Sequence, residues 1–179
     1  MKATGIVRRI DDLGRVVIPK EIRRTMRIRE GDPLEIYTDA DGEVIFKKYS
    51  PMGELNGFAA QICESMTKTT GLPAAVCDRD SVIAAAGAGH RELLDRHIGL
   101  ELEQIMEGRR AYAAQQTGRA VPATAAADAP QAEIIVPILC EGDVLGCVLF
   151  LQGEGKRAGE LELKLAGTVA GFLGKQMET

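Results

Sequence analysis

Tryptophan is absent from the 179 residues, and only four phenylalanines and three tyrosines occur. This shortage of rings argues against an aromatic platform for stacking nucleobases. Long apolar runs are missing too, because nothing approaches the roughly 18 consecutive apolar residues of a membrane-spanning helix. The first five residues lack the apolar core of a signal peptide. We therefore expect a cytoplasmic protein that has no membrane as a partner.

The sequence is equally poor in patterns that carry catalysis or hold metals. It contains no Cys-x-x-Cys pair and no Gly-x-x-x-x-Gly-Lys phosphate loop, and no nucleophile has an evident base. The cysteines are too few for a disulfide scaffold. We expect no catalysis, no metal site and no known cofactor. The residues that could contradict this expectation are Cys63, Cys77, Cys140, Cys147, His90 and His97.

Charge is distributed unevenly along the chain. Residues 1–29 carry nine Lys/Arg and three acidic residues, a balance of +6, although the whole chain has a net charge of −4. Residues 30–50 and 51–179 are both acidic. A basic segment on an acidic chain is typical of a protein with one end that meets a polyanion. The alternative at this point is a charged face that only contacts solvent.

The first fifty residues contain signals for five short elements. A helix opens after Pro19, and its basic residues recur at helical spacing on one face, whereas Ile22 and Met26 lie on the other. A segment of about fifty residues is too small to form a hydrophobic core alone. We therefore expect an obligate dimer that exchanges strands. The predicted strands are Thr4–Ile10, Arg15–Ile18, Leu34–Tyr37 and Glu43–Tyr49, and the basic helix residues are Lys20, Arg23, Arg24 and Arg27.

The run from Thr4 to Pro19, followed by Glu21–Arg24, resembles the AbrB-type swapped-hairpin DNA-binding domain of bacterial transition-state regulators. The resemblance covers residues 1–50 and implies a barrel-like dimer with its arginines on one surface and double-stranded DNA as the partner. Guanidinium groups suit this role, because they bind phosphate bidentately and also pair with guanine. The DNA-contacting residues that it implies are Arg8, Arg15, Arg23 and Arg24, with Lys2 and Arg9 as further phosphate contacts.

Residues 51–53 are expected to form a linker, and residues 54–179 a second domain. Helical spacing runs from Glu54 to about Thr70, and apolar runs at 133–140 and 144–151 indicate a central hairpin. The other predicted elements are strands at 72–77, 82–86 and 111–116, helices at 90–97, 101–107 and 159–177, and a long loop at 118–130. Pro137 lacks the N–H that a strand interior needs and suggests a bulge or an unpaired position.

This element order resembles a GAF small-molecule sensor domain. The predicted fold class is therefore α+β, a swapped-hairpin β-barrel dimer followed by a GAF-like α/β/α domain. A ligand could bind between the sheet and the 118–130 loop, but the cyclic-nucleotide signature of some GAF domains is absent. Ligand sensing and a purely dimerising role both stay open. Together the two domains resemble regulators of forespore gene expression in spore-forming bacteria.

The last predicted helix has two apolar seams, more than one domain can cover. One seam packs on the sheet of its own domain, and the other would leave a patch that soluble monomers rarely tolerate. We expect a four-helix contact with a second copy, so that two swapped dimers unite into a homotetramer; the alternative is a dimer that uses both interfaces. The expected interface residues are Leu55, Phe58, Ile62, Leu161, Leu165 and Phe172.

Two other classes of function remain. Antitoxins share the swapped-hairpin head but usually carry a disordered tail, whereas residues 54–179 are apolar and periodic. A redox enzyme of the GAF type would need a reactive cysteine. The cysteines fall on apolar helix and strand positions, which favours buried structural thiols. The two histidines are more simply surface residues than metal ligands.

Overall fold

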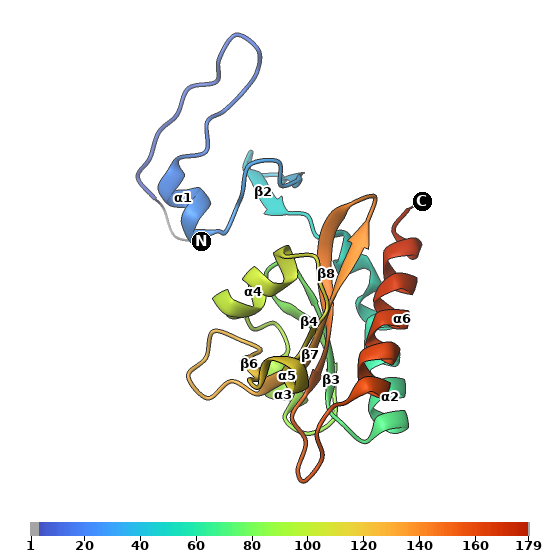
Figure 1. Cartoon of the computed structure of the whole chain (residues 1–179). Helices are drawn as coiled ribbons and strands as arrows, with labels where there is room; N and C mark the ends of the chain where they lie inside the picture. The colour runs from blue at the N-terminus through green and yellow to red at the C-terminus, as the bar shows by residue number, and fades with distance from the viewer. Residues whose placement is uncertain (1–3, 179) are drawn as a thin grey trace. The chain divides into compact units, whose positions relative to one another are not determined.

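The computed structural model describes residues 4–178 and divides the chain into two compact units, Met1–Tyr49 and Ser50–Thr179 (Figure 1). Residues 51–53, expected as a linker, belong to the second unit. There Pro51–Leu55 forms a short 3-10 helix, η1, which leads directly into a long helix.

The first unit contains one short helix, α1 (Lys20–Thr25), and a hairpin of β1 (Leu34–Thr38) and β2 (Val44–Lys48). The antiparallel register runs from Leu34 opposite Lys48 to Thr38 opposite Val44. The Asp39 carboxylate holds the turn of the hairpin by accepting the backbone N–H groups of Asp41 and Glu43 at 3.1 and 2.9 Å. The helix and hairpin predicted in this region are therefore present.

The two strands predicted at Thr4–Ile10 and Arg15–Ile18 are not formed in the single chain. Within residues 4–18 the structure has two extended arms and a turn, with no strand assigned. A strand needs a neighbour for its backbone N–H and C=O groups. The structure of one chain supplies none along these arms, so their β-forming residues are extended but unpaired.

The second unit is a sheet covered by helices on both faces. Its strands are β3 (Ala74–Asp78), β4 (Val82–Ala86), β5 (Tyr112–Ala113), β6 (Val121–Pro122), β7 (Gln131–Cys140) and β8 (Asp143–Leu151), and its helices are α2 (Asn56–Thr70), α3 (His90–Leu93), α4 (Leu100–Glu107), α5 (Ala114–Thr117) and α6 (Glu160–Gln176). The sheet order is β4-β3-β8-β7-β5, with β6 also on β7, and all pairs are antiparallel. Helices α2 and α6 cover one face, and α3 and α4 the other (Figure 1).

Alternation along the central strands divides the interior into two cores. In β8, Val148 and Phe150 face the α2/α6 side, whereas Cys147, Leu149 and Leu151 face the α3/α4 side. All five are at most 1% exposed. A sheet buried on both faces has long apolar strands, which explains why the two continuous apolar runs of the sequence form β7 and β8.

Two predicted elements differ in extent. The strand expected at 111–116 is two residues of β5 followed by the helical turn α5, and the helix expected at 90–97 ends at Leu93. After it the chain pairs with β4, where the Val82 N–H donates to the Arg96 carbonyl at 3.0 Å. Pro137 itself is paired, opposite Cys147, and the nearest irregularity of the ladder is a register shift between Ile138 and Leu139.

Candidate nucleic-acid interface

The described arginines predicted to contact DNA lie on the arms, the turn and α1. Arg8, Arg9, Arg15 and Arg24 are exposed, Arg23 is half-buried, and Lys2 lies outside the described residues. Arg23 and Arg24 occupy the last turn of α1, where positive charge interacts favourably with the helix dipole. These arginines can therefore bind a polyanion without breaking many contacts within the protein.

The turn between the arms is closed by hydrogen bonds around Asp11. Its backbone N–H donates to the Arg15 carbonyl at 2.9 Å, and its carboxylate oxygen Oδ1 accepts the N–H of Arg15 at 2.7 Å and that of Leu13 at 3.0 Å. Gly14 has a positive φ of 76° and donates its N–H to the Asp11 carbonyl at 3.0 Å. The sequence predicted this turn but not the role of the Asp11 side chain.

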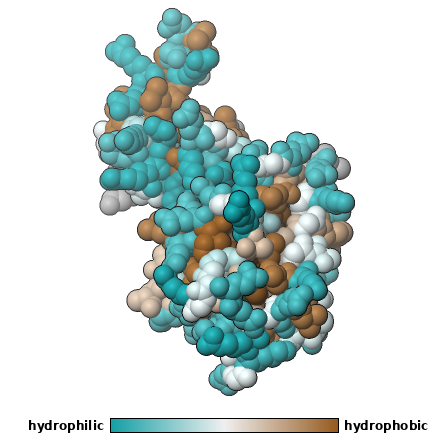
Figure 2. Space-filling model, in the orientation of Figure 1, coloured by the Kyte–Doolittle hydropathy of each residue, from teal (hydrophilic) through white to brown (hydrophobic). Residues whose placement is uncertain are grey.

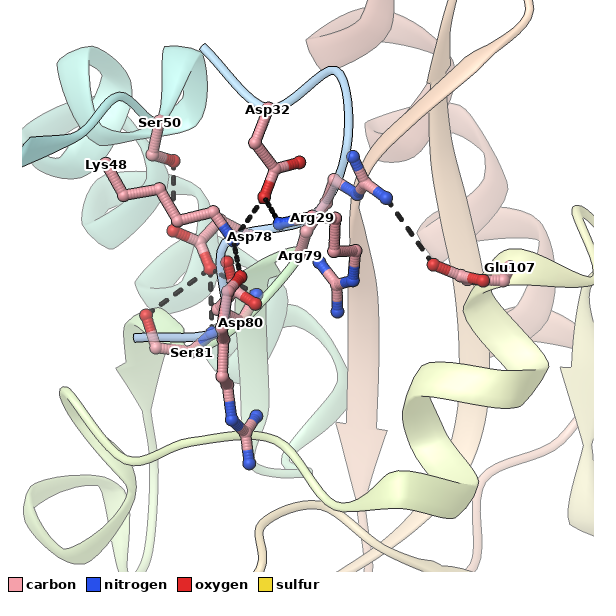
Figure 3. A network of polar contacts seen from close by, with 10 residues as sticks. Arg29, Asp32, Lys48, Ser50, Asp78, Arg79, Asp80, Ser81 and Glu107 are labelled. Carbon is pink, nitrogen blue, oxygen red and sulfur yellow. Dashed lines mark hydrogen bonds and ion pairs between the residues drawn. The ribbon is translucent and has the colours of Figure 1, made fainter. Parts of the chain in front are cut away.

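A second set of polar contacts fixes the chain between α1 and β1. The Lys48 Nζ lies 2.9 Å from Asp32 Oδ2 and donates to the Arg27 carbonyl at 2.7 Å, and the same Asp32 oxygen accepts the Arg29 N–H at 2.9 Å (Figure 3). These contacts tie the end of the basic helix to β2. Sequence reasoning missed the two contacts of Lys48, because partners 16 and 21 residues apart leave no local pattern.

Most apolar residues of the first unit are exposed. Pro19 is the only buried residue among 4–49, and α1 buries none. On the apolar face of α1, Ile22 is half-buried and Met26 is 59% exposed. Val7 is 87% exposed and Ile36 62%. Figure 2 shows apolar side chains at the surface of this unit. A soluble protein rarely leaves so much apolar surface in water.

The helical face of the second unit is the other predicted interface. Leu161, Phe172 and Phe58 are 64%, 45% and 39% exposed, and the Phe58 and Phe172 rings lie 5.8 Å apart between centroids. Leu55, Ile62 and Leu165 are half-buried at the edge of the α2/α6 core. A groove of about 300 Å³ runs between the two helices and is lined by Phe58, Gln61, Ile62, Ser65, Met66, Thr69, Leu165 and Val169.

Cys63, Cys77 and Cys140 occupy environments that disfavour the thiolate. Cys63, Cys77 and Cys147 are fully buried. Burial raises the pKa of Cys63 to about 12. The hydrogen bond with Cys147, followed by burial, raises the pKa of Cys77 well above its usual value. Cys140 is half-exposed, and desolvation followed by the negative charge of Glu141 raises its pKa as well.

The two histidines lie against backbone carbonyls in the second unit. His90 Nδ1 is 2.9 Å from the Gly87 oxygen, and His97 Nδ1 is 3.3 Å from that of Asp80. Within residues 4–178 no group of three or more His, Cys, Asp or Glu side chains could hold a metal ion. No helix in the same range is long and apolar enough to cross a membrane.

Residues 118–130 were expected to form a loop that borders a ligand site, but they contain β6, in which Val121 pairs with Ala132 of β7. Val121, Ala123 and Ala129 are at most 8% exposed. Ala125–Asp128 form the exposed tip of this segment. The side chains of Leu93, Ile98 and Leu102 lie in the core beneath it. The core next to residues 118–130 is apolar, and this packing does not identify the chemistry of a ligand.

Comparison with known proteins identifies both units. The family described as "Stage V sporulation protein T C-terminal, transcription factor" matches residues 54–178, and "Antidote-toxin recognition MazE, bacterial antitoxin" matches residues 7–53. The chain is 48% identical to stage V sporulation protein T of Bacillus subtilis (strain 168) over 99% of both chains. It is also 65% identical to the transition state regulatory protein AbrB of the same organism over 51 residues, which cover 28% of this chain and 52% of that one.

The fold of the second unit has its own relatives. The GAF domain of a phosphoenolpyruvate-protein phosphotransferase from Acinetobacter aligns with 73% of this chain and 84% of its own, at 11% identity and a TM-score of 0.51. At this identity the likeness concerns the fold alone, and it confirms the prediction of a GAF-like domain. The AbrB-type resemblance of the first fifty residues is confirmed by sequence identity. The chain therefore belongs to the stage V sporulation protein T family of transcription factors, with an AbrB-type domain followed by a GAF-like domain.

Proposed function

We propose that this regulator binds double-stranded DNA sequence-specifically as a dimer of its first unit, through Arg8, Arg15, Arg23 and Arg24, with Lys2 and Arg9 as flanking phosphate contacts. One observation carries the proposal. Residues 4–49 carry exposed arginines and exposed apolar side chains, and Pro19 is the only buried residue among them. A second copy whose arms pair with these would cover that surface, complete the missing strands and place two sets of arginines in symmetric half-sites.

Two features favour DNA over the alternative partner, a toxin. The chain carries a folded second unit with two cores instead of a disordered tail that could wrap a protein. The AbrB relative is named as a transition state regulator. We infer that the match to the antitoxin family reflects the shared head, and that this chain acts on DNA.

Anisotropy measurements with the full chain and a duplex enriched from a random-sequence pool test the DNA-binding site. Arg15→Ala or Arg23→Ala should weaken binding by about 1–3 kcal/mol where the arginine reads a base, and affinity should fall with salt at a log–log slope near −0.9 per phosphate contact. Arg91→Ala removes an equal charge from an exposed position of α3 and should change nothing. Wild-type affinity in an Arg15/Arg23/Arg24 triple alanine variant would overturn the assignment.

Dimer formation by the first unit is tested on residues 1–53 alone. Because arm exchange supplies the missing core, this fragment should be dimeric in light scattering. It should bind the same duplex more weakly than the full chain, which gains avidity from joined heads. A folded monomer would refute the swapped dimer.

We further propose that the helical face of α2 and α6 joins two such dimers into a homotetramer, with Leu55, Phe58, Ile62, Leu161, Leu165 and Phe172 at the contact. Burying exposed leucine and phenylalanine side chains contributes about 1.5–3 kcal/mol each. A Leu165→Glu/Phe172→Glu variant should therefore drop to a dimer in light scattering. Leu94→Glu/Leu100→Glu places the same charges on exposed leucines of the opposite side of the sheet and should keep the wild-type mass. A dimeric wild type unaffected by the first variant would refute the proposal.

The remaining parts of the proposal follow from family membership and from the buried thiols. We place the protein in the cytoplasm, on the nucleoid of the forespore, and assign it no catalysis. Thiol titration of the native protein tests the last point, because a redox enzyme would show a fast-reacting cysteine. The GAF-like unit serves oligomerisation, ligand sensing or both. Thermal shift with a metabolite library separates these roles, since a ligand that binds the native state raises Tm.

A further inference from the structure

The turn that carries Arg15 contains two adjacent carboxylates, Asp11 and Asp12, within the most basic segment of the chain. A carboxylate beside the phosphate backbone opposes DNA binding by simple charge repulsion. The two side chains differ in what they do locally. Asp11 holds the turn with its carboxylate, whereas Asp12 is exposed, and within residues 4–178 its side chain holds none of the N–H groups of the turn.

The Asp11 contacts enclose the backbone of Arg15 from both sides. The Asp11 carboxylate accepts the Arg15 N–H at 2.7 Å, and the Asp11 N–H donates to the Arg15 carbonyl at 2.9 Å. Leu13 and Gly14 are bound to the same residue. These hydrogen bonds therefore hold the main chain from which the Arg15 side chain starts in the absence of DNA.

We propose that Asp11 is a positioning residue for DNA recognition: its carboxylate orders the turn so that the Arg15 guanidinium meets a base edge at low entropic cost. The inference rests on the proposed DNA binding through Arg15. A bidentate contact with guanine O6 and N7 tolerates little misplacement, whereas a phosphate contact tolerates much. Fixing the turn in advance removes an ordering cost that binding would otherwise bear. Asp11 thus contributes more to specific than to non-specific affinity.

Alanine variants of the two neighbours give opposite expectations in the anisotropy assay. Charge alone predicts unchanged or tighter DNA binding for both, because each loses one negative charge. Positioning predicts that only Asp11→Ala weakens binding to the enriched duplex. The loss is at most that of Arg15→Ala, about 5- to 150-fold for a bidentate base contact, with little change on random duplex. Asp12→Ala is the matched control.

Two more variants of Asp11 separate position from charge. Asp11→Asn keeps an acceptor oxygen at the same reach and should restore most of the specific affinity. Asp11→Glu keeps the charge but displaces the oxygens by a methylene group and should behave like Asp11→Ala. Circular dichroism and light scattering check that each variant keeps the wild-type fold and mass. If Asp11→Ala fails to fold, the comparison of Asp11→Glu with Asp11→Asn decides.

A double-mutant cycle with Arg15→Ala tests the route of the effect. Asp11 acts through Arg15, so Asp11→Ala should cost nothing further in the Arg15→Ala background. Additive losses, or equal effects of Asp11→Ala and Asp12→Ala, would overturn the proposal while leaving DNA binding in place. No effect of Arg15→Ala alone would instead refute the assigned DNA site.

Discussion

The same substitution should have opposite effects at two glycines of α6. Gly174 lies against β7, and a Cβ built there would approach the Leu139 carbonyl oxygen to 2.2 Å, whereas a Cβ at Gly167 would have no heavy atom within 4 Å. Both lie inside a helix, where alanine is more favourable than glycine by about 1 kcal/mol. At Gly167 that gain is unopposed. At Gly174 the helix must move about 1 Å away from the strand to restore an ordinary carbon–oxygen contact.

The expected magnitudes follow from that displacement. Overpacking a close helix–strand contact costs about 1–3 kcal/mol or more, which exceeds the propensity gain. For a chain of this size, 1 kcal/mol corresponds to about 2–4 °C in Tm. Gly167→Ala should therefore raise Tm by about 2–4 °C, and Gly174→Ala should lower it by several degrees.

Calorimetry of the full chain, with light scattering to confirm an unchanged oligomer, measures both. Equal shifts of the same sign would refute the close approach of α6 to β7.

Three further predictions concern the second unit. Glu133 is 2% exposed and accepts the Ala158 N–H at 2.7 Å. Because Glu133→Ala leaves this buried donor unpaired, it should lower the free energy of unfolding, measured in urea, by about 1–3 kcal/mol. Glu160→Ala removes an exposed carboxylate and is the near-neutral control. Burial raises the pKa of Cys63 from 9.0 to about 12, so this thiol ionises at lower pH in the unfolded chain than in the folded one. The contribution of Cys63 to the free energy of unfolding should therefore be level below pH 9 and fall between pH 9 and 12. An equally steep fall of the free energy of unfolding in a Cys63→Ala variant would contradict this cause. In the native protein at pH 8, an aromatic disulfide reagent should modify Cys140 before the three buried thiols, and simultaneous reaction of all four would show that the cores open readily.

Much of the second unit could be predicted because its signals are local. The apolar runs that form β7 and β8 and the two seams of α6 are visible as periodicity. In the seam that faces the sheet, Ala166, Ala170 and Leu173 are buried, and Leu163 and Met177 at its ends are partly buried. The helix predicted at 90–97 was wrong beyond Leu93. The residues that follow form hydrogen bonds with β4, and such a long-range partner overrides a local helical pattern.

The candidate site was predictable at the level of residue type and not of geometry. Spacing placed Lys20, Arg23 and Arg24 on a helix, and all three lie in α1. The same prediction was wrong for Arg27, which lies beyond the end of α1 with a positive φ of 52°. The resemblance, and not the spacing, selected the arginines proposed to contact DNA. The contacts that fix their backbones depend on a side chain folding back on the main chain, as at Asp11, or on partners far apart in sequence, as at Asp32 and Lys48. Aspartate in a turn suggests such a contact, but it does not say which N–H group is accepted.

Both units expose apolar side chains, but only the second unit also has a buried core of its own. This difference affects the order in which the proposed assembly forms. In the first unit almost nothing among residues 4–49 is buried, so a folded monomer has no core to sustain it, and folding and pairing must occur together. In the second unit two cores are complete without a partner, and only Leu161, Phe172 and Phe58 remain well exposed on the α2/α6 face. Association there joins units that are already folded, so it can be weak and reversible. In the proposed tetramer, dilution should therefore dissociate the helical contact first, and the proposed swapped dimer should persist until the first unit unfolds. Light scattering over a concentration series should show tetramer passing to dimer, with a folded monomer at any concentration contradicting this order.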